Sequence, residues 1–171
     1  EAYCIAKYEV IKHYVNSPPR IVDNPGWGDK WCRLATLTTP AFSFMHPLCY
    51  RQDQNGKLVK TVTKEWLDQL TWEGIAWWYQ DDGTLTQAKG VHISTHSFPL
   101  EQVQLLVDML VSRGVEAKVQ PVKKGEKTYF TVSIGVESTR KFVSKIAPFI
   151  HESMKYKIDI NVSCNLIPYW I

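Results

Sequence analysis

The sequence lacks any long apolar run, and nowhere do apolar residues continue for the 18 or so positions that a membrane-spanning helix needs. It does not open with a basic segment followed by an apolar stretch, so it shows no secretory signal. These absences predict a soluble intracellular protein without a membrane partner, either cytoplasmic or organellar (mitochondrion or chloroplast). With 171 residues, 44% of them hydrophobic, the chain can bury one good core or two small repeats.

Cysteine is scarce and irregularly spaced, with no Cys-x-x-Cys pair among Cys4, Cys32, Cys49 and Cys164. This spacing favours buried free thiols over a zinc site or disulfides. His92 and His96 also fail as a zinc pair. They lie within or beside a predicted strand, where four residues separate the Cα atoms by roughly 13 Å.

Charge of one sign is not in great excess, because the net charge of +3 is modest for a protein that binds nucleic acid. The lysines are nevertheless clustered along the chain, and clusters of this kind can grip phosphates. The three groups are Lys57, Lys60 and Lys64; Lys118, Lys123, Lys124 and Lys127; and Lys155 and Lys157.

The most informative stretch is Leu70–Leu85, which reads as an apolar helix that ends in Asp81 and Asp82 and is followed at once by Gly83. Thr71 is a suitable N-cap. Two carboxylates at a helix C-terminus oppose the helix dipole, so an outside cation is expected beside them. Most Asp-Asp-Gly tripeptides are solvated turns, and that alternative stays open.

Gly74, Trp78 and Asp82 fall four apart and therefore on one stripe of this helix. The small Gly74 would let a second helix approach closely, which predicts a helix seam with Asp82 at its foot. A carboxylate delivered to such a seam suggests a divalent metal site. Asp81 points about 100° away and is expected to face solvent or to support the site from behind.

The remaining pattern predicts an alternation of helices and hairpins. Before the motif we expect a helix over 1–15, an extended piece over 20–23, a strand over 31–39, a helix from Pro40 through Leu48, and a short helix over 64–70. After it we expect a hairpin over 84–89 and 91–95, a helix over 100–112, a hairpin over 116–122 and 128–134, and a helix over 139–149.

A weak internal repeat divides the chain. Residues 1–51 look like the back half of a first copy, and 52–63 form a polar connector with an Asn-Gly turn. Residues 64–158 look like a complete second copy, and the apolar tail 159–171 is expected to pack back on the protein.

The segment WEGIAWWYQDDGTL resembles the second motif of the LAGLIDADG homing endonucleases, which closes in an acid and a glycine, here Asp82-Gly83. The likeness continues in HISTHSFPLEQVQLLVDMLVSRGVEAKV downstream, in Lys60-Thr61-Val62 and in SMKYKI, so it covers roughly 2–158. It implies an α+β fold with an αββαββα repeat and an antiparallel DNA-binding sheet, preceded here by a partial first repeat.

The resemblance also implies a function, namely site-specific, Mg²⁺-dependent cleavage of double-stranded DNA. Asp82 and Gly83 match the metal-binding end of the motif, and Lys60 and Lys157 match the family's basic active-site positions. Lys155 is a rival to Lys157, and both lysines could instead be exposed solubility residues. The second motif helix would come from a missing upstream segment or from a second chain. The alternatives are a catalytically silent DNA-binding protein, an RNA splicing maturase of the same fold, and an inert fragment.

The two hairpins of residues 84–95 and 116–134 are the expected DNA-binding surface, because a sheet with polar alternate residues can lie in the major groove. An ordinary solvated sheet face is the alternative. The candidate contact residues are Thr84, Thr86, Gln87, Lys89, His92, Ser94, Lys118, Gln120, Lys123, Lys124 and Lys127.

Overall fold

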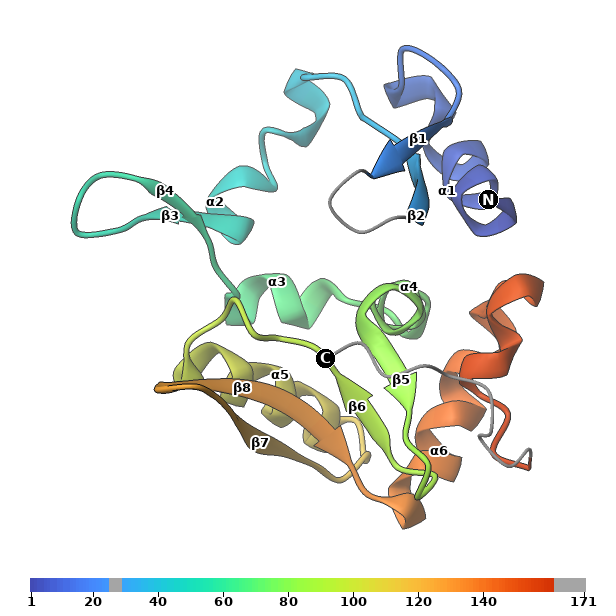
Figure 1. Cartoon of the computed structure of the whole chain (residues 1–171). Coiled ribbons are helices and arrows are strands. Elements are labelled where there is room, and N and C mark those ends of the chain that lie inside the picture. The colour runs from blue at the N-terminus through green and yellow to red at the C-terminus, as the bar shows by residue number, and fades with distance from the viewer. Residues whose placement is uncertain (25–28, 162–171) are drawn as a thin grey trace.

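The computed structural model describes residues 1–24 and 29–161. Figure 1 shows two units, one formed by the first 60 or so residues and one by the rest of the chain. Among the described residues, no helix combines the length and the apolar character needed to cross a membrane. The segment Asn24-Pro25-Gly26, whose residue types are typical of a turn, lies largely outside the described residues, and so does the tail beyond Asn161.

The N-terminal unit is built from short elements. They are α1 (Ala2–Ile11), η1 (Lys12–Tyr14), β1 (Arg20–Asn24), β2 (Asp29–Arg33), η2 (Pro40–Phe42) and α2 (His46–Cys49). The predicted helix over 1–15 is α-helical only as far as Ile11, and the predicted strand over 31–39 ends at Arg33. The predicted helix from Pro40 is broken into η2 and α2, because Pro47 has no N–H to donate to a preceding turn and lies instead in the first turn of a new helix.

A small hairpin, β3 (Tyr50–Gln52) and β4 (Leu58–Lys60), begins two residues before the predicted connector 52–63 and continues into it. The carboxylate of Asp53 accepts hydrogen bonds from the backbone N–H groups of Asn55 and Lys57, both at 2.9 Å. Gly56 follows with φ +75°, a left-handed conformation that glycine adopts without steric cost. The Asn-Gly turn was predicted, but the pairing of the strands beside it was not.

The C-terminal unit follows the predicted order of helices and hairpins. Its elements are α3 (Lys64–Gln69), α4 (Trp72–Asp82), β5 (Gly83–Leu85), β6 (Val91–Ile93), α5 (Leu100–Ser112), β7 (Ala117–Lys124), β8 (Lys127–Ile134), α6 (Val136–Ile146), η3 (Ala147–Phe149) and η4 (Glu152–Lys157). The strands β5 and β6 are shorter than predicted because Thr86 and Gly90 close the turn between them, with N–H of Thr86 donating to O of Gly90 at 2.8 Å.

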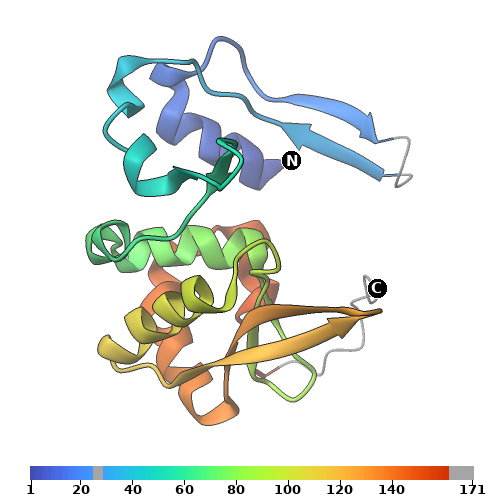
Figure 2. The same cartoon turned by 90° about the vertical axis from the view of Figure 1, so that its left-hand side faces the viewer.

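The strands β5, β6, β8 and β7 form one antiparallel sheet in that order. The helix α5 packs against β7 and β8 (Figures 1 and 2), and α4 packs against α6, where the ring of Tyr79 meets that of Phe142 edge-on. The buried apolar residues run from Val62 to Ile150. By contrast, no side chain described before Thr61 is buried. The N-terminal unit therefore has no core of its own within the described chain.

Candidate active site

The helix α4 delivers two carboxylates to its C-terminal end. Its start is fixed by Thr71, whose hydroxyl accepts a hydrogen bond from N–H of Gly74 at 3.2 Å, as the predicted N-cap requires. At the other end, N–H of Gly83 donates to O of Tyr79, and the chain passes directly into β5. A Cβ atom at Gly83 would overlap the ring of Tyr79 and come within 2.6 Å of its carbonyl oxygen. Glycine at this position therefore allows the helix to end immediately after Asp82.

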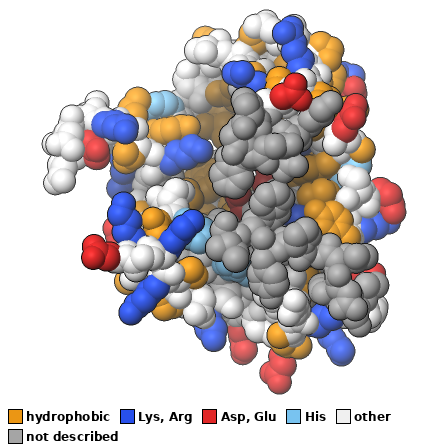
Figure 3. All heavy atoms as spheres, viewed as in Figure 1, with side chains coloured by type: hydrophobic (Ala, Val, Ile, Leu, Met, Phe, Trp, Pro, Cys, Tyr) orange, Lys and Arg blue, Asp and Glu red, His pale blue; other side chains and the backbone are white. Residues whose placement is uncertain are grey.

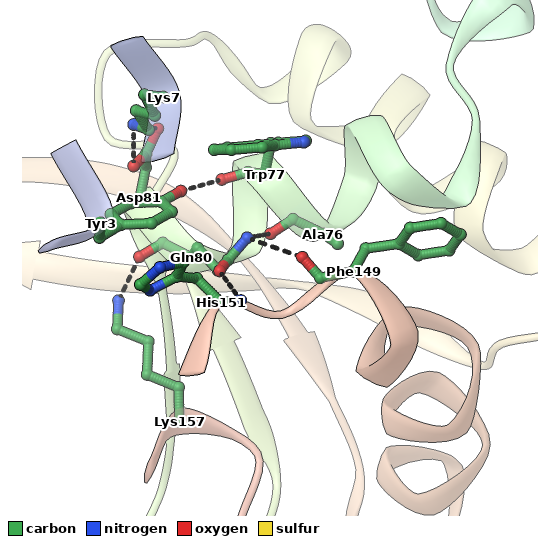
Figure 4. Close-up of polar contacts among 9 residues, drawn as sticks. All are labelled: Tyr3, Lys7, Ala76, Trp77, Gln80, Asp81, Phe149, His151 and Lys157. Atoms are coloured by element: carbon green, nitrogen blue, oxygen red, sulfur yellow. Dashed lines mark hydrogen bonds and ion pairs between the residues drawn. The ribbon is translucent and has the colours of Figure 1, made fainter. Parts of the chain in front are cut away.

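The cation expected beside the acids is present, and it comes from α1. Lys7 Nζ lies 2.5 and 2.7 Å from the two carboxylate oxygens of Asp81. Lys7 Nζ also lies 4.6 Å from the centroid of the Tyr3 ring, and this ring stacks on Trp77 with the centroids 5.7 Å apart (Figure 4). The sequence predicted that Asp81 faces solvent or supports the site, and the structure makes it the ion-pair partner of Lys7. Sequence reasoning missed Lys7, which stands 74 residues away with no motif around it.

A second lysine caps the same helix end. Lys157 Nζ donates to the carbonyl oxygen of Gln80 at 2.7 Å (Figure 4). Its partial burial lowers the pKa of the ammonium, although the charges of Asp81 and Asp82 act in the opposite direction. Lys155, the rival to Lys157, forms an exposed ion pair with Glu152 instead. The structure thus brings Lys157, and not Lys155, to the acidic end of α4.

Asp82 is solvent-accessible, and four charged side chains influence it. Partial desolvation raises the pKa of its carboxyl group, and the negative charge of Asp81 raises it further. The charges of Lys157, Lys7 and Lys60 lower this pKa. The charges of the predicted residues Lys60 and Lys157 therefore both act on Asp82.

The chemistry of this site fits a magnesium ion in part. Magnesium prefers hard oxygen ligands and is usually bound by one or two carboxylates together with waters and substrate phosphates. Asp82 offers such a carboxylate, while Asp81 is already engaged by Lys7. Within residues 1–24 and 29–161, no three His, Cys, Asp or Glu side chains gather as a metal site. Asp82 could supply part of a coordination shell that phosphate, water or a second carboxylate would complete.

At Gly74 the predicted helix seam has no second helix against it among the described residues. A Cβ at Gly74 would contact only Leu70 and Thr71, atoms of the preceding turn, at 3.1 and 3.9 Å. No other helix of the described residues approaches that position. Trp78 is half-buried and packs against the edge of the core. The contacts of α1 fall instead on the neighbouring stripe, at Trp77 and Asp81.

The register of the four-stranded sheet gathers polar side chains on one face. Thr84 lies opposite His92, His92 opposite Ser133, and Ser133 opposite Lys118, which makes one row across all four strands. Because directly paired residues share a face and side chains alternate along a strand, this face also carries three further predicted residues. These are Gln120, Lys124 and Lys127.

Three predicted contact residues are placed differently from the expectation. Lys123 lies opposite Thr128, on the other face of the sheet from Lys124. The hydroxyl of Thr86 accepts a hydrogen bond from N–H of Gly90 at 3.0 Å and so closes the turn. Within the described chain, Nε2 of His92 is buried without a hydrogen-bond partner, and burial lowers the pKa of this imidazole. In this arrangement that nitrogen is not offered to a DNA groove.

The remaining predicted residues of this surface lie near the turn and near the acid. Gln87 and Ser94 are exposed, and Lys89 adopts φ 65° in the turn between β5 and β6. N–H of Ser94 donates to O of Asp82 at 2.9 Å, so the end of β6 adjoins the acidic end of α4.

The N-terminal hairpin offers a surface that the sequence analysis did not identify. Figure 2 shows β1–β2 and β7–β8 extending toward the same side of the molecule. In β1–β2, Arg20 lies opposite Arg33 and Val22 opposite Trp31, and these pairs share one face. Trp31 is 59% exposed. On the space-filling surface, Lys and Arg side chains follow the left-hand edge, where Figure 1 has the tips of β3–β4 and β7–β8 (Figure 3).

Comparison with known proteins shows which family the chain belongs to. The model of the LAGLIDADG DNA endonuclease family matches residues 1–142. The chain belongs to this family. The resemblance noted in the sequence is therefore confirmed.

Relatives of this family member include endonucleases and maturases. The intron-encoded endonuclease ai4 of Dictyostelium discoideum is 29% identical over 128 residues, 74% of this chain and 76% of that protein. The DNA endonuclease I-ChuI of Chlamydomonas applanata is 25% identical over 93% of this chain and 78% of its own. The cytochrome b mRNA maturase bI2 of Saccharomyces cerevisiae is 26% identical over 91% of this chain, but over only 35% of its own length.

A solved structure establishes the fold. The homing endonuclease I-WcaI bound to its DNA recognition sequence superposes with a TM-score of 0.76 at 24% identity. The match covers 94% of this chain and 72% of that one. The predicted α+β LAGLIDADG fold is thereby confirmed.

Proposed function

We propose that this chain is the catalytic part of a site-specific DNA endonuclease of the homing type, which hydrolyses phosphodiesters with the help of Mg²⁺. The observation that carries the proposal is the acidic end of α4. There a solvent-accessible Asp82 lies within the electrostatic influence of Lys157 and Lys60, beside an antiparallel sheet with a polar face. Membership of the family supports the same reaction class.

Each side chain at the acidic end has a distinct role in this proposal. A bound magnesium ion would polarise the phosphate and favour ionisation of a water. Asp82 would supply one of the ligands of this ion. The ion pair with Lys7 keeps Asp81 turned toward α1. Lys157 is a compact positive charge that can stabilise the negative charge developing on the phosphate. Because burial lowers its pKa, Lys157 also gives up a proton more readily than an exposed lysine does.

The same proposal assigns double-stranded DNA to the polar sheet face. The row from Thr84 to Lys118 and the lysines at the tip of β7–β8 would lie along the major groove, with the lysines gripping phosphates. The outward pairs of β1–β2, with Arg20, Arg33 and Trp31, would extend this surface along the DNA.

The test of the metal role compares two isosteric substitutions. We expect Asp82→Asn to abolish Mg²⁺-dependent cleavage by the assembled enzyme while DNA binding stays largely intact, because it removes a metal ligand at nearly constant shape. Asp81→Asn is the matched control and should reduce cleavage far less, since this carboxylate is engaged by Lys7. Equal losses of cleavage rate in the two variants would refute the assignment.

We further propose that a second motif helix packs on the open stripe of Gly74 and Trp78. An upstream segment is favoured over a second copy of this chain, because residues 1–51 already resemble the rest of that segment's repeat. The α1 helix supports this proposal, since it is apolar and yet has no buried residue. Gly74→Ala should leave the chain by itself folded but impair plasmid linearisation by the assembled enzyme. Linearisation by a monomer of this chain alone would overturn the proposal.

RNA splicing is a second candidate function, favoured by the relatives that are maturases. It would use the same fold without DNA cleavage. Binding of this chain to a structured intron RNA, with no cleavage of any DNA in the presence of Mg²⁺ and the second motif helix, would favour the maturase over the endonuclease.

A further inference from the structure

Two buried polar residues of α4 connect it to the segment that carries Lys157. The hydroxyl of Tyr79 donates to the carbonyl oxygen of Lys157 at 2.6 Å. The amide oxygen of Gln80 accepts from N–H of His151 at 2.7 Å. The amide nitrogen of Gln80 donates to the carbonyl oxygens of Ala76 at 3.2 Å and Phe149 at 3.4 Å (Figure 4).

These hydrogen bonds hold both ends of η4. Gln80 fixes the chain at Phe149 and His151, immediately before η4 begins at Glu152. Tyr79 fixes the last residue of η4, which is Lys157 itself. The Lys157 side chain then returns to α4 and donates to the carbonyl oxygen of Gln80 at 2.7 Å. Two consecutive residues of α4 thus determine where η4 starts, where it ends, and where its last side chain points.

The burial of this pair makes the connection rigid. Tyr79 is 0% exposed and Gln80 is 1% exposed, so water does not compete for their hydrogen bonds. A buried amide is costly unless its polar atoms are paired, and both polar atoms of the Gln80 side chain are paired here. Filling the core alone would have required only an apolar side chain of similar volume. A role in positioning η4 explains why these two buried positions carry polar side chains, one bonded to the last residue of η4 and one to the residues just before it.

We infer that Tyr79 and Gln80 are positioning residues, which hold the Lys157 ammonium at the end of α4 beside Asp82. This inference rests on the proposed function, because Lys157 acts on the phosphate only in that context. Because both side chains are buried, we expect Tyr79 and Gln80 themselves to touch neither substrate nor metal. They act through the placement of Lys157, and a displaced ammonium would stabilise the transition state less well.

The deciding variant is Tyr79→Phe, which removes one hydroxyl and keeps the ring that meets Phe142 edge-on. The matched control is Tyr156→Phe, also in η4, where the tyrosine is 57% exposed. A second variant, Gln80→Met, releases the start of η4 and leaves the Tyr79 hydrogen bond in place. For all three, thermal melting verifies the fold, and single-turnover cleavage by the assembled enzyme gives the rate and the DNA affinity separately.

A readout that does not need cleavage is the titration of Lys157, followed by NMR of lysine-labelled protein and assigned with Lys157→Met. Burial lowers the pKa of Lys157, so a loosened η4 should raise this pKa toward its ordinary value. We expect that rise in Tyr79→Phe and Gln80→Met, together with a roughly tenfold slower cleavage step at unchanged DNA affinity. Tyr156→Phe should show neither change.

The possible results separate the two levels of the proposal. An unchanged Lys157 titration in both Tyr79→Phe and Gln80→Met would overturn the positioning role, whatever the cleavage data show. A changed titration with an unchanged cleavage rate would overturn it as well, because the placement of Lys157 would then not matter to the reaction. If the wild-type assembly cleaves no DNA, the proposed function fails, and the titration still decides whether Tyr79 and Gln80 place the ammonium.

Discussion

Gly83, the residue that ends the motif, should be among the positions least tolerant of a methyl group. It is buried as the first residue of β5, directly after the last turn of α4, and its φ of −92° is accessible to any residue. The constraint is therefore one of space and not of backbone conformation. An added Cβ would overlap the ring of Tyr79 and lie 2.6 Å from the carbonyl oxygen of the same residue.

The magnitude follows from what must move. Overpacking a well-filled site costs about 1–3 kcal/mol. One of the atoms that would have to move is the backbone oxygen of Tyr79, which also accepts the hydrogen bond from N–H of Gly83. A shift of this oxygen weakens the last hydrogen bond of α4, and an unpaired buried donor costs about 1–3 kcal/mol. Loss of glycine entropy in the unfolded chain returns about 0.4–1 kcal/mol. We expect Gly83→Ala to lower the free energy of unfolding by about 3 kcal/mol, which lowers the Tm by about 6–12 °C.

The assay is urea denaturation followed by circular dichroism, with Gly74→Ala as the matched control on the same helix. Among the described residues, a Cβ at Gly74 meets only side-chain atoms, those of Leu70 at 3.1 Å and Thr71 at 3.9 Å. Alanine also favours the helix over glycine by about 1 kcal/mol. The control should therefore be neutral or stabilising. If Gly83→Ala lost less than about 1 kcal/mol, or no more than the control, the close approach of Tyr79 could not be the reason for glycine after the acid.

Two further predictions concern pH and salt. Partial desolvation and the charge of Asp81 raise the pKa of Asp82 in the folded state, so the folded protein binds this proton more tightly than the unfolded chain does. The protonated carboxyl group therefore stabilises the fold at low pH, and this stabilisation is lost as the pH rises through the folded pKa. Asp82→Asn should therefore raise the Tm at pH 7, by an increment that shrinks as the pH falls toward 4; a loss of stability at pH 7 would contradict this. Neutralising Lys124 and Lys127, which share the polar face, should reduce the slope of log K against log salt by about two, for specific and random DNA alike. Neutralising Lys123 together with Lys124 tests the expectation from sequence that both lysines contact DNA, and a slope that falls as far would place Lys123 in the interface too.

Much of the C-terminal unit could be predicted because its signals are local. The bounds of α5 follow from its apolar spacing and from Gly114, which adopts φ +79° after the helix. Thr71 caps α4 as its side-chain chemistry predicts. The N-terminal unit was predicted less well, since short elements such as η2 and α2 depend on which backbone groups find partners, and Pro47 divides a segment that otherwise reads as one helix.

At the second hairpin, Lys123 and Lys124 were expected in the turn, where the alternation of a strand does not apply. The structure extends β7 as far as Lys124, and neighbouring residues of a strand point to opposite faces, so only one of these two lysines lies on the polar face. Thr86 and His92 are a different matter. The hydroxyl of Thr86 accepts a hydrogen bond inside the turn, and Nε2 of His92 is buried. Neither fact can be read from the alternation of residues along the strands.

By itself the sequence determined the acid-glycine end of α4, the order of helices and hairpins, and the family. These depend on side-chain chemistry and spacing within a few residues. Only the tertiary structure decided which cation meets which acid, because Lys7 reaches Asp81 across 74 residues and Tyr79 holds Lys157 across 78. No periodicity connects positions so far apart. Their encounter is set by how α1 and η4 pack against α4, and the packing of buried groups such as Tyr79 and Gln80 is a property of the whole fold.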